Sequence, residues 1–156
     1  MKGWMTAWVL VLATQASVSD DDLARLLGEP FRGELVYLDY RSGREVSIPA
    51  ALSVEKTGSD AWSFRYEYPE EPQANSTDDV TIADGGATLA GAQVVEKEAL
   101  PDGVRIVTER AGTDDDRSAT IRATYTVTPT RLTIRKDVRF DGENEWFMRN
   151  EFRFER

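Results

Sequence analysis

A lysine and an asparagine on the apolar sides of the last two predicted strands are the residues best placed for chemistry. Over 131–140 and 146–154, hydrophobic side chains alternate with mostly charged ones, as in strands that bury one face. The apolar set at even positions includes Lys136 in the first strand and Asn150 in the second. An ammonium group in an apolar interior needs a counter-charge, water or a polar ligand. Both residues are therefore candidates for contacting an acidic or polar head group.

The loop between these strands decides how the two side chains meet. Because both apolar faces fall on even positions, only a loop with an odd number of residues keeps them on one side of the sheet. A three-residue loop places Ile134 opposite Asn150. A five-residue loop pairs Phe140 with Trp146 and places Lys136 opposite Asn150. Either register brings Lys136 and Asn150 within cross-strand or diagonal reach.

The preceding strand leaves room beside the lysine. A four-residue turn over 128–131 pairs Val127 with Leu132, which places the small Ala123 opposite Lys136. Two roles for Lys136 follow. It pairs with an internal carboxylate or reaches solvent and serves structure only, or it anchors a ligand.

Aromatic side chains supply the candidate walls of a cavity around this lysine. In the segment 61–68 they alternate strictly with polar residues, so they share one face of a strand. The same aromatics would be ordinary core residues if the interior were filled. The predicted ligand-binding residues are Lys136, Asn150, Tyr125, Trp62, Phe64, Tyr66, Trp146 and Phe152.

Composition narrows the available chemistry. The net charge of −9 disfavours nucleic acid as a partner, because phosphates repel an acidic surface. The sequence contains neither His nor Cys, which excludes Ser-His-Asp and Cys-His nucleophiles, disulfides and His-ligated metals. Acidic runs at 20–22, 78–79 and 113–117 lack the spacing of a calcium-binding loop, so no metal site is predicted. An enzyme would have to use Asp, Glu, Lys or Tyr, and we expect binding without a cofactor.

The first 19 residues differ from the rest and are predicted to be a signal peptide. Lys2 is followed by an apolar run over 4–13 and then by small and polar residues. The run is too short to cross a bilayer, so we expect no stable membrane insertion after cleavage. The predicted location is the periplasm of a bacterium or the secreted fraction.

The remaining elements predict an all-β fold. A short helix over 20–27 carries Leu23, Leu26 and Leu27 on one apolar face, and we expect all three to be buried where the helix covers one end of the strands. A linker then extends to residue 30. From 31 to 156 the chain alternates between short amphipathic strands and turns too short for crossover helices, so neighbouring strands pair antiparallel. About nine or ten strands must curl to bury their apolar faces. We expect an up-and-down barrel or a strongly curved half-barrel, with a β-sandwich as the competitor.

This architecture resembles that of the calycins, the group that includes the lipocalins. The lipocalin Gly-x-Trp signature is absent from the first strand, where Arg32-Gly33-Glu34-Leu35 stands. The segment 61–89 is also similar to the periplasmic lipoprotein carriers of the Lol system, in which an aromatic strand ends at Pro and the next hairpin turns on Asp-Gly. The Arg-Pro that usually precedes that strand is absent here. The matching positions are Trp62, Phe64, Tyr66, Pro69, Asp84 and Gly85.

Both resemblances imply a barrel or half-barrel that binds an apolar ligand or a lipid, and they assign no residue roles. The sequence thus predicts a monomeric, exported protein that binds a small apolar or amphiphilic ligand. The alternative is a filled barrel that serves as a structural or protein-interaction module of the envelope. The volume of the interior distinguishes the two.

Export can be tested by intact-mass analysis of the protein recovered from the periplasm. We expect a mature chain that results from cleavage between Ala16 and Asp20, because small residues precede both ends of that interval. A recovered chain that still begins at Met1 would contradict the prediction.

Overall fold

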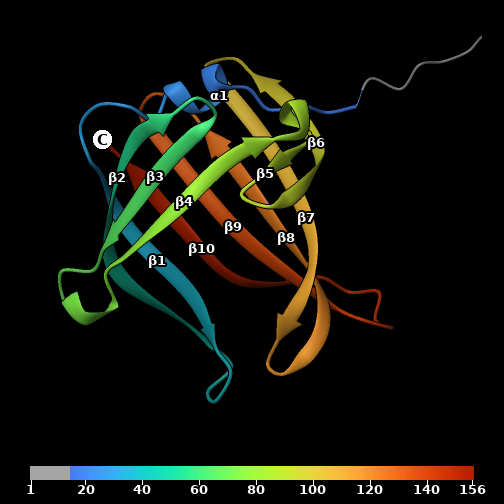
Figure 1. Ribbon diagram of the computed structural model, residues 1–156. Helices are drawn as coiled ribbons and strands as arrows, with labels where there is room; N and C mark the ends of the chain where they lie inside the picture. Colours follow the sequence, from blue (N-terminus) through green and yellow to red (C-terminus); the bar gives the residue numbers. More distant parts are fainter. Residues whose placement is uncertain (1–14) are drawn as a thin grey trace, which may run out of the picture.

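The strands of the computed structural model, which describes residues 15–156, form a closed antiparallel barrel of ten strands (Figure 1). Each strand pairs with its neighbours in the sequence, and β1 closes on β10. The prediction of an up-and-down barrel is confirmed, and closure excludes the half-barrel. The strands are β1 (Phe31–Asp39), β2 (Arg44–Gly58), β3 (Ala61–Glu67), β4 (Ser76–Ala83), β5 (Thr88–Leu89), β6 (Ala92–Leu100), β7 (Gly103–Asp114), β8 (Arg117–Val127), β9 (Arg131–Phe140) and β10 (Phe147–Glu155).

The helical segments are short. They are α1 (Asp20–Ala24) and two 3-10 turns, η1 (Pro72–Ala74) and η2 (Asp84–Gly86), which lie before and after β4. The predicted Asp-Gly turn at 84–86 is confirmed. All three of its residues have positive φ, a conformation that Gly and Asp tolerate best.

The barrel wall is continuous at one end only. β5 has two residues, and it joins β4 and β6 through two residue pairs on each side. Residues 76–81 of β4 pair only with β3, and residues 110–114 of β7 pair only with β8. Two strand edges are therefore free below β5, and they flank a lateral opening.

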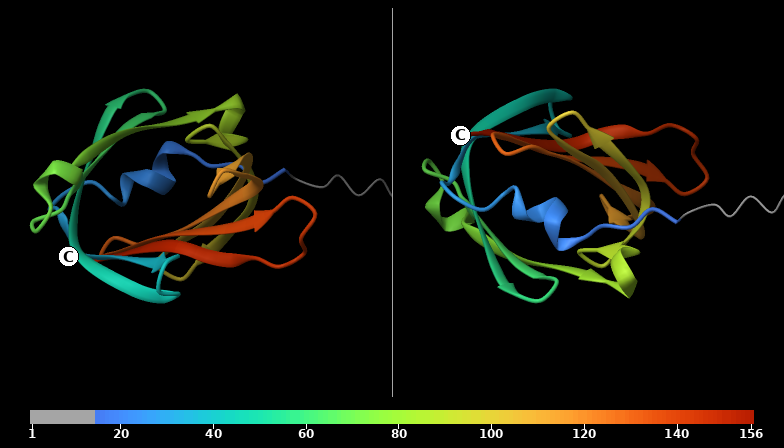
Figure 2. Two further views of the ribbon diagram at one scale, coloured as in Figure 1. Left: turned by 90° about the horizontal axis from the view of Figure 1, so that it is seen from below. Right: turned by 90° about the horizontal axis from the view of Figure 1, so that it is seen from above.

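The end of the barrel beside β5 is plugged by α1 and the turn that follows it. Viewed along the barrel, the helix lies inside the ring of strands (Figure 2). Leu23 and Leu26 are each 1% exposed and join a core that includes Phe31, Leu52 and Trp62. A helix of five residues has no independent stability, so this burial holds it in place.

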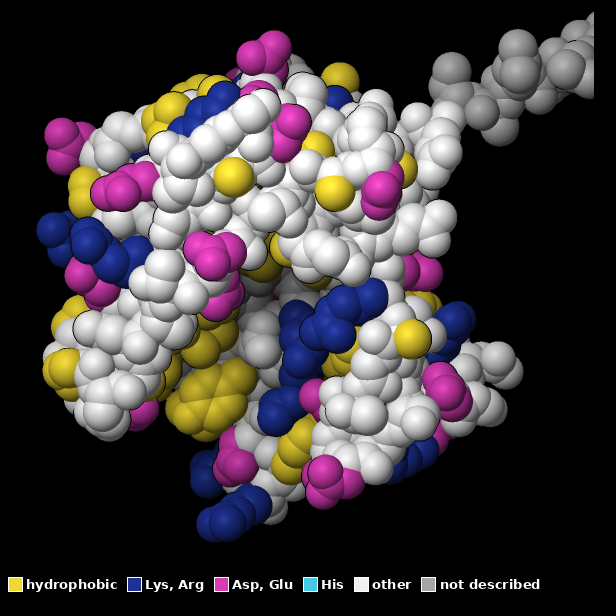
Figure 3. Space-filling view, viewed as in Figure 1, with side chains coloured by type: hydrophobic (Ala, Val, Ile, Leu, Met, Phe, Trp, Pro, Cys, Tyr) yellow, Lys and Arg dark blue, Asp and Glu magenta, His cyan; other side chains and the backbone are white. Residues whose placement is uncertain are grey.

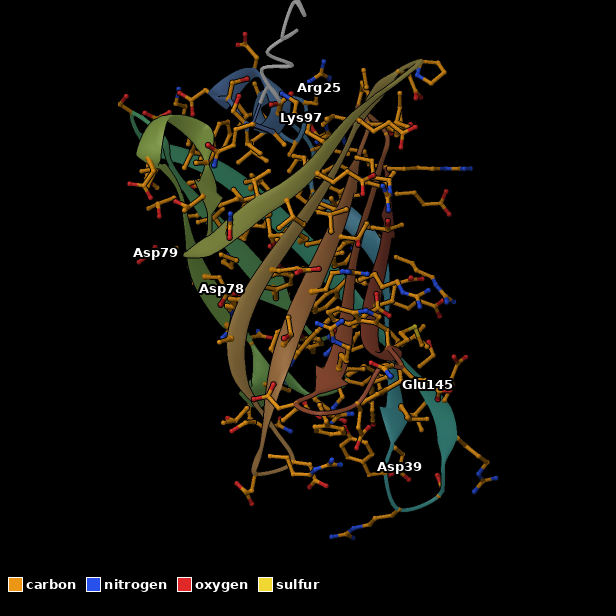
Figure 4. All side chains as sticks on the ribbon, turned by 90° about the vertical axis from the view of Figure 1, so that its right-hand side faces the viewer. Arg25, Asp39, Asp78, Asp79, Lys97 and Glu145 are labelled. Atoms are coloured by element: carbon orange, nitrogen blue, oxygen red, sulfur yellow. The ribbon has the colours of Figure 1, made fainter. Side chains whose placement is uncertain are left out.

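Acidic residues of the plug also bond to the strands. Asp20 accepts hydrogen bonds from Lys56 Nζ at 2.5 Å and from Trp62 Nε1 at 3.0 Å. The bond from Lys56 is the main cause that lowers the pKa of Asp20. Asp22 accepts from Lys97 Nζ at 2.6 Å, and Figure 4 shows Lys97 beside the plug. These bonds connect α1 to β2, β3 and β6.

Arg156 holds the other end of the plug. Its guanidinium lies over the Phe31 ring, with Cζ 4.2 Å from the centroid. It also satisfies carbonyl groups at the end of the helical turn that have no partner within the helix. The acceptors are the backbone oxygens of Arg25, Leu26, Leu27 and Glu29.

The segment just before α1 is part of the barrel. The predicted signal peptide lies mostly outside the described residues, but Val18 is 4% exposed and its N–H donates to the Gly86 carbonyl. A Cβ at Gly86 would lie 2.3 Å from the Val18 carbonyl oxygen, so this close approach requires glycine. Ser19 caps the helix. Cleavage after Ala16 would retain these contacts, whereas cleavage after Ser19 would remove them.

The plug differs from the prediction at its C-terminal end. The helix ends at Ala24 rather than at residue 27, and Leu27 is 41% exposed. The expected burial of all three leucines is therefore wrong for Leu27. Once the chain leaves the helix at Arg25, the spacing that placed Leu27 beside Leu23 no longer applies.

A β-bulge also changes the start of β10. The register shifts between Met148 and Asn150, so Phe147 rather than Met148 lies opposite Val138. An extra residue in one strand turns the preceding side chains to the other face. Phe147 therefore packs inward against Phe140, at 5.5 Å between ring centroids.

Leu26 and Leu27 form a matched pair for testing the plug. Leu26→Ala should lower the free energy of unfolding by about 2–4 kcal/mol, the usual range for a buried leucine. Leu27→Ala, at the exposed neighbour, should change it by less than about 0.5 kcal/mol. Chemical denaturation of both variants provides the measurement, and equal effects would contradict the placement of the plug.

Candidate functional site

A cavity of about 590 Å³ lies inside the barrel, below the plug. Its lining comes from β3 and β4 on one side and from β7 to β10 on the other, with Leu89 of β5 and Ala92 of β6 between them. It opens between the free edges of β4 and β7, and Figure 3 shows this opening as a hollow with hydrophobic and basic side chains on its walls. The interior is therefore neither filled nor sealed.

A second cluster packs inside the far end of the barrel, away from α1. It contains Ala119, Ile121, Val138 and Phe140, with Phe147 packed against it. The barrel thus has a packed core at each end and a cavity between them.

The apolar wall of the cavity matches the prediction in large part. Phe64, Tyr66, Tyr125 and Phe152 all line it. The rings of Tyr66 and Phe152 are 4.9 Å apart between centroids, so they form one continuous aromatic surface.

Two predicted wall residues lie elsewhere. Trp62 faces inward but is 1% exposed beneath the plug, where its indole donates to Asp20. Trp146 lies on the outer face, with Arg122 Cζ 3.9 Å and Arg139 Cζ 4.6 Å from its ring. The prediction that Trp146 faces the interior is wrong, because the bulge in β10 reverses the side-chain alternation that it assumed.

The predicted pairing of Lys136 with its neighbours is confirmed. Lys136 lies opposite Asn150 on β10 and opposite Ala123 on β8, and all three residues line the cavity. This is the pairing expected from the five-residue loop, although the bulge alters the strand before Asn150. The lysine side chain is 33% exposed.

Lys136 also has an internal counter-charge. Its Nζ lies 3.9 Å from Asp114 Oδ1 in the β7–β8 hairpin, which is an ion-pair distance but too long for a hydrogen bond. Asp114 is 8% exposed, accepts from the Tyr40 hydroxyl, and lies 3.4 Å from Arg149 Nε. The Arg149 guanidinium stacks on Tyr40 at 4.2 Å. The carboxylate is thus shared by two cations, of which Arg149 is the nearer.

Three charged residues that line the cavity were not predicted to do so. Arg110 lies on β7, and Asp78 and Asp79, both labelled in Figure 4, lie on β4. Arg110 continues the inward series of Ile106 and Thr108, so extending that alternation by two residues would have found it. Asp78 lies opposite Phe64 in a polar stretch, 76–79, whose sequence has no strand-like alternation of apolar residues.

Three tyrosines border the same opening. Burial is the main cause that raises the pKa of Tyr66, Tyr68 and Tyr125, and the charge of Asp78 raises all three further. The pKa of Tyr125 reaches about 12, although Arg110 acts in the opposite direction. Among residues 15–156, the hydroxyls of Tyr66 and Tyr125 form no hydrogen bond. Both hydroxyls can therefore donate to a molecule in the cavity.

No cluster of three or more potential metal-ligating side chains occurs within residues 15–156. Over the same residues, no helix has the length and apolar character needed to span a membrane. Comparisons with protein-family models, curated proteins and solved structures find no match for this chain.

The raised tyrosine pKa values predict a loss of stability at alkaline pH. An unfolded tyrosine releases its proton near pH 10, whereas folded Tyr125 retains it to about pH 12. Between these values the folded state binds more protons, so the free energy of unfolding falls as pH rises.

Tyr125→Phe should remove part of this dependence. In the wild-type protein, Tyr125 should lower the free energy of unfolding by about 1–2 kcal/mol between pH 10 and 12, and the variant should lack this decrease. A fully buried tyrosine would give a larger decrease, because the cavity here is open to solvent. Denaturation curves at several pH values provide the measurement, with Tyr37→Phe as a control. An unchanged slope in Tyr125→Phe would contradict the assignment.

Proposed function

We propose that this protein binds a small amphiphilic ligand in the cavity, through the lateral opening between β4 and β7. The observation that carries the proposal is the cavity itself, whose volume of about 590 Å³ lies within the range of small-molecule sites, about 300–1,000 Å³. A closed ten-stranded barrel is compatible with a calycin-like architecture, in keeping with this proposal.

The lining has the composition that such a ligand requires. Phe64, Tyr66 and Phe152 offer an apolar surface, and covering it would contribute about 25 cal/mol per Å² removed from water. Lys136 and Asn150 supply polar groups on the adjacent surface. A wall that is apolar on one part and polar on another orients an amphiphile by its two ends.

The filled-barrel alternative predicts an interior packed at the density of a protein core. A cavity of this size weighs against it, since the lining side chains lose contacts that packing would provide. The lack of His favours binding over acid–base catalysis.

Export to the periplasm or secretion is part of the proposal, and it depends on residues 1–19. The net charge is −9 for the full chain and becomes −10 once Lys2 is removed, and it would keep an exported monomer soluble. Contacts of Val18 and Ser19 favour cleavage after Ala16, which leaves Ser17 as the first residue of the mature chain.

Filling the cavity tests the proposed function. Ala123→Phe places a ring beside Lys136 and should reduce binding of anilinonaphthalene sulfonate, a fluorescent amphiphile, by at least about tenfold, the effect of losing roughly 1.4 kcal/mol. Thr120→Phe adds the same ring to the outer face of β8 and should leave binding unchanged. Fluorescence titration gives the affinities, and far-ultraviolet circular dichroism shows whether both variants fold.

Mass spectrometry of small molecules that co-purify with the protein complements this titration. A wild-type protein that binds no probe and carries no small molecule would overturn the proposed function. Equal loss of binding in Ala123→Phe and Thr120→Phe would place the probe outside the cavity and would also count against it.

A further inference from the structure

We propose that the ligand is an anionic amphiphile whose carboxylate-type head group binds between Lys136, Asn150 and Arg110, with its apolar chain along Phe152 and Tyr66. This inference rests on the proposed function and adds the chemical class of the ligand and the direction in which it lies.

The first support is the order of side chains across the barrel wall. Strand pairing places Thr108, Ala123, Lys136 and Asn150 in one row across β7 to β10. The next row towards the plug contains Ile106, Tyr125, Ile134 and Phe152. A polar row thus lies directly beside an apolar row, one side-chain step away.

The second support is the balance of donors and acceptors. Lys136 makes no hydrogen bond within residues 15–156, because its only charged partner lies 3.9 Å away. Arg110 has no hydrogen-bond or ion-pair partner among the same residues, and neither has the Asn150 side chain. An ammonium and a guanidinium can only donate. These donors form no hydrogen bonds within the protein, so a ligand with strong acceptors would complement them. A carboxylate provides two acceptor oxygens and a negative charge.

The third support is the placement of the charged side chains around the cavity. Lys136 and Arg110 lie on β9 and β7, whereas Asp78 and Asp79 lie on β4. An anionic head group would therefore be attracted to the wall formed by β7 to β10.

The small side chain of Ala123 provides the space that this head group needs. Ala123 is the direct neighbour of Lys136 on β8, and both line the cavity. A larger residue there would cover the ammonium group. The head group can therefore approach Lys136 from the cavity while Asp114 remains with Arg149 and Tyr40.

Asp78 supports a competing proposal, a cationic head group among the tyrosines. Asp78 and its neighbour Asp79 lie on the free edge of β4 and are exposed, so water can satisfy both carboxylates without a ligand. The anionic head group is the reading that the polar groups of the cavity favour.

Isothermal titration calorimetry compares three ligands that have the same alkyl chain and differ in the head group. They are lauric acid, lauryl alcohol and laurylamine, each below its micelle concentration. The acid should bind at least about tenfold more tightly than the alcohol, the ratio expected from one charge-assisted hydrogen bond. Lys136→Met should reduce the affinity for the acid by about tenfold and leave that for the alcohol unchanged. Arg110→Met should act in the same direction.

Lys56→Met serves as the matched control, because Lys56 pairs with Asp20 at the plug and does not line the cavity. It should not change the affinity for any of the three ligands. Lys136→Met is expected to fold, since Asp114 retains Arg149 and Tyr40, and its melting curve verifies this.

The possible outcomes separate this inference from the proposed function. Equal affinities for acid and alcohol would overturn the anionic head group and leave the binding function intact. Tighter binding of the amine would overturn it in favour of Asp78. If none of the three ligands binds, and no small molecule co-purifies, the proposed function falls and this inference with it.

Discussion

In a barrel of about eight strands, the inward side chains just fill the interior. This barrel has ten strands, so its interior is wider than its own inward side chains can fill. The interior can be stable only if something other than the wall occupies its ends. One end is occupied by α1 and its following turn, through Leu23 and Leu26. The other is occupied by hydrophobic residues of the last three strands, among them Phe140 and Phe147. The cavity is what remains between these two cores.

The same constraint explains where the polar contacts lie. A helix of five residues cannot hold its position alone, so its charged groups bond to the wall and its last carbonyls bond to Arg156. At the other end, Asp114 from the β7–β8 hairpin forms ion pairs with both Lys136 and Arg149. Each core is thus bordered by ion pairs that bring distant strands together. The lateral opening follows from the shortness of β5, which closes the wall at one end and leaves the edges of β4 and β7 free.

Much of this arrangement could be predicted because side-chain alternation and turn length are local properties. Alternation with period two identified the inward faces of β3, β8 and β9. The turn lengths placed Lys136 opposite Ala123 and within reach of Asn150, and the structure shows which of the two possible registers is formed. Local rules failed where one residue was inserted or where a helix ended early. The bulge at Arg149 moved Trp146 to the outside, and the end of α1 at Ala24 left Leu27 exposed. Neither event has a residue type that marks it in the sequence.

The sequence by itself determined the all-β class, the order of antiparallel strands, and the inward position of an ammonium group among aromatic side chains. Only the tertiary structure decided that the barrel is closed, that its interior is open rather than filled, and that Asp114 is the counter-charge of Lys136. It also decided that Arg110 of β7 and Asp78 of β4 line the same opening in the wall. The physical reason is that closure and cavity volume depend on the curvature of all ten strands together, and no segment of the chain carries that information alone.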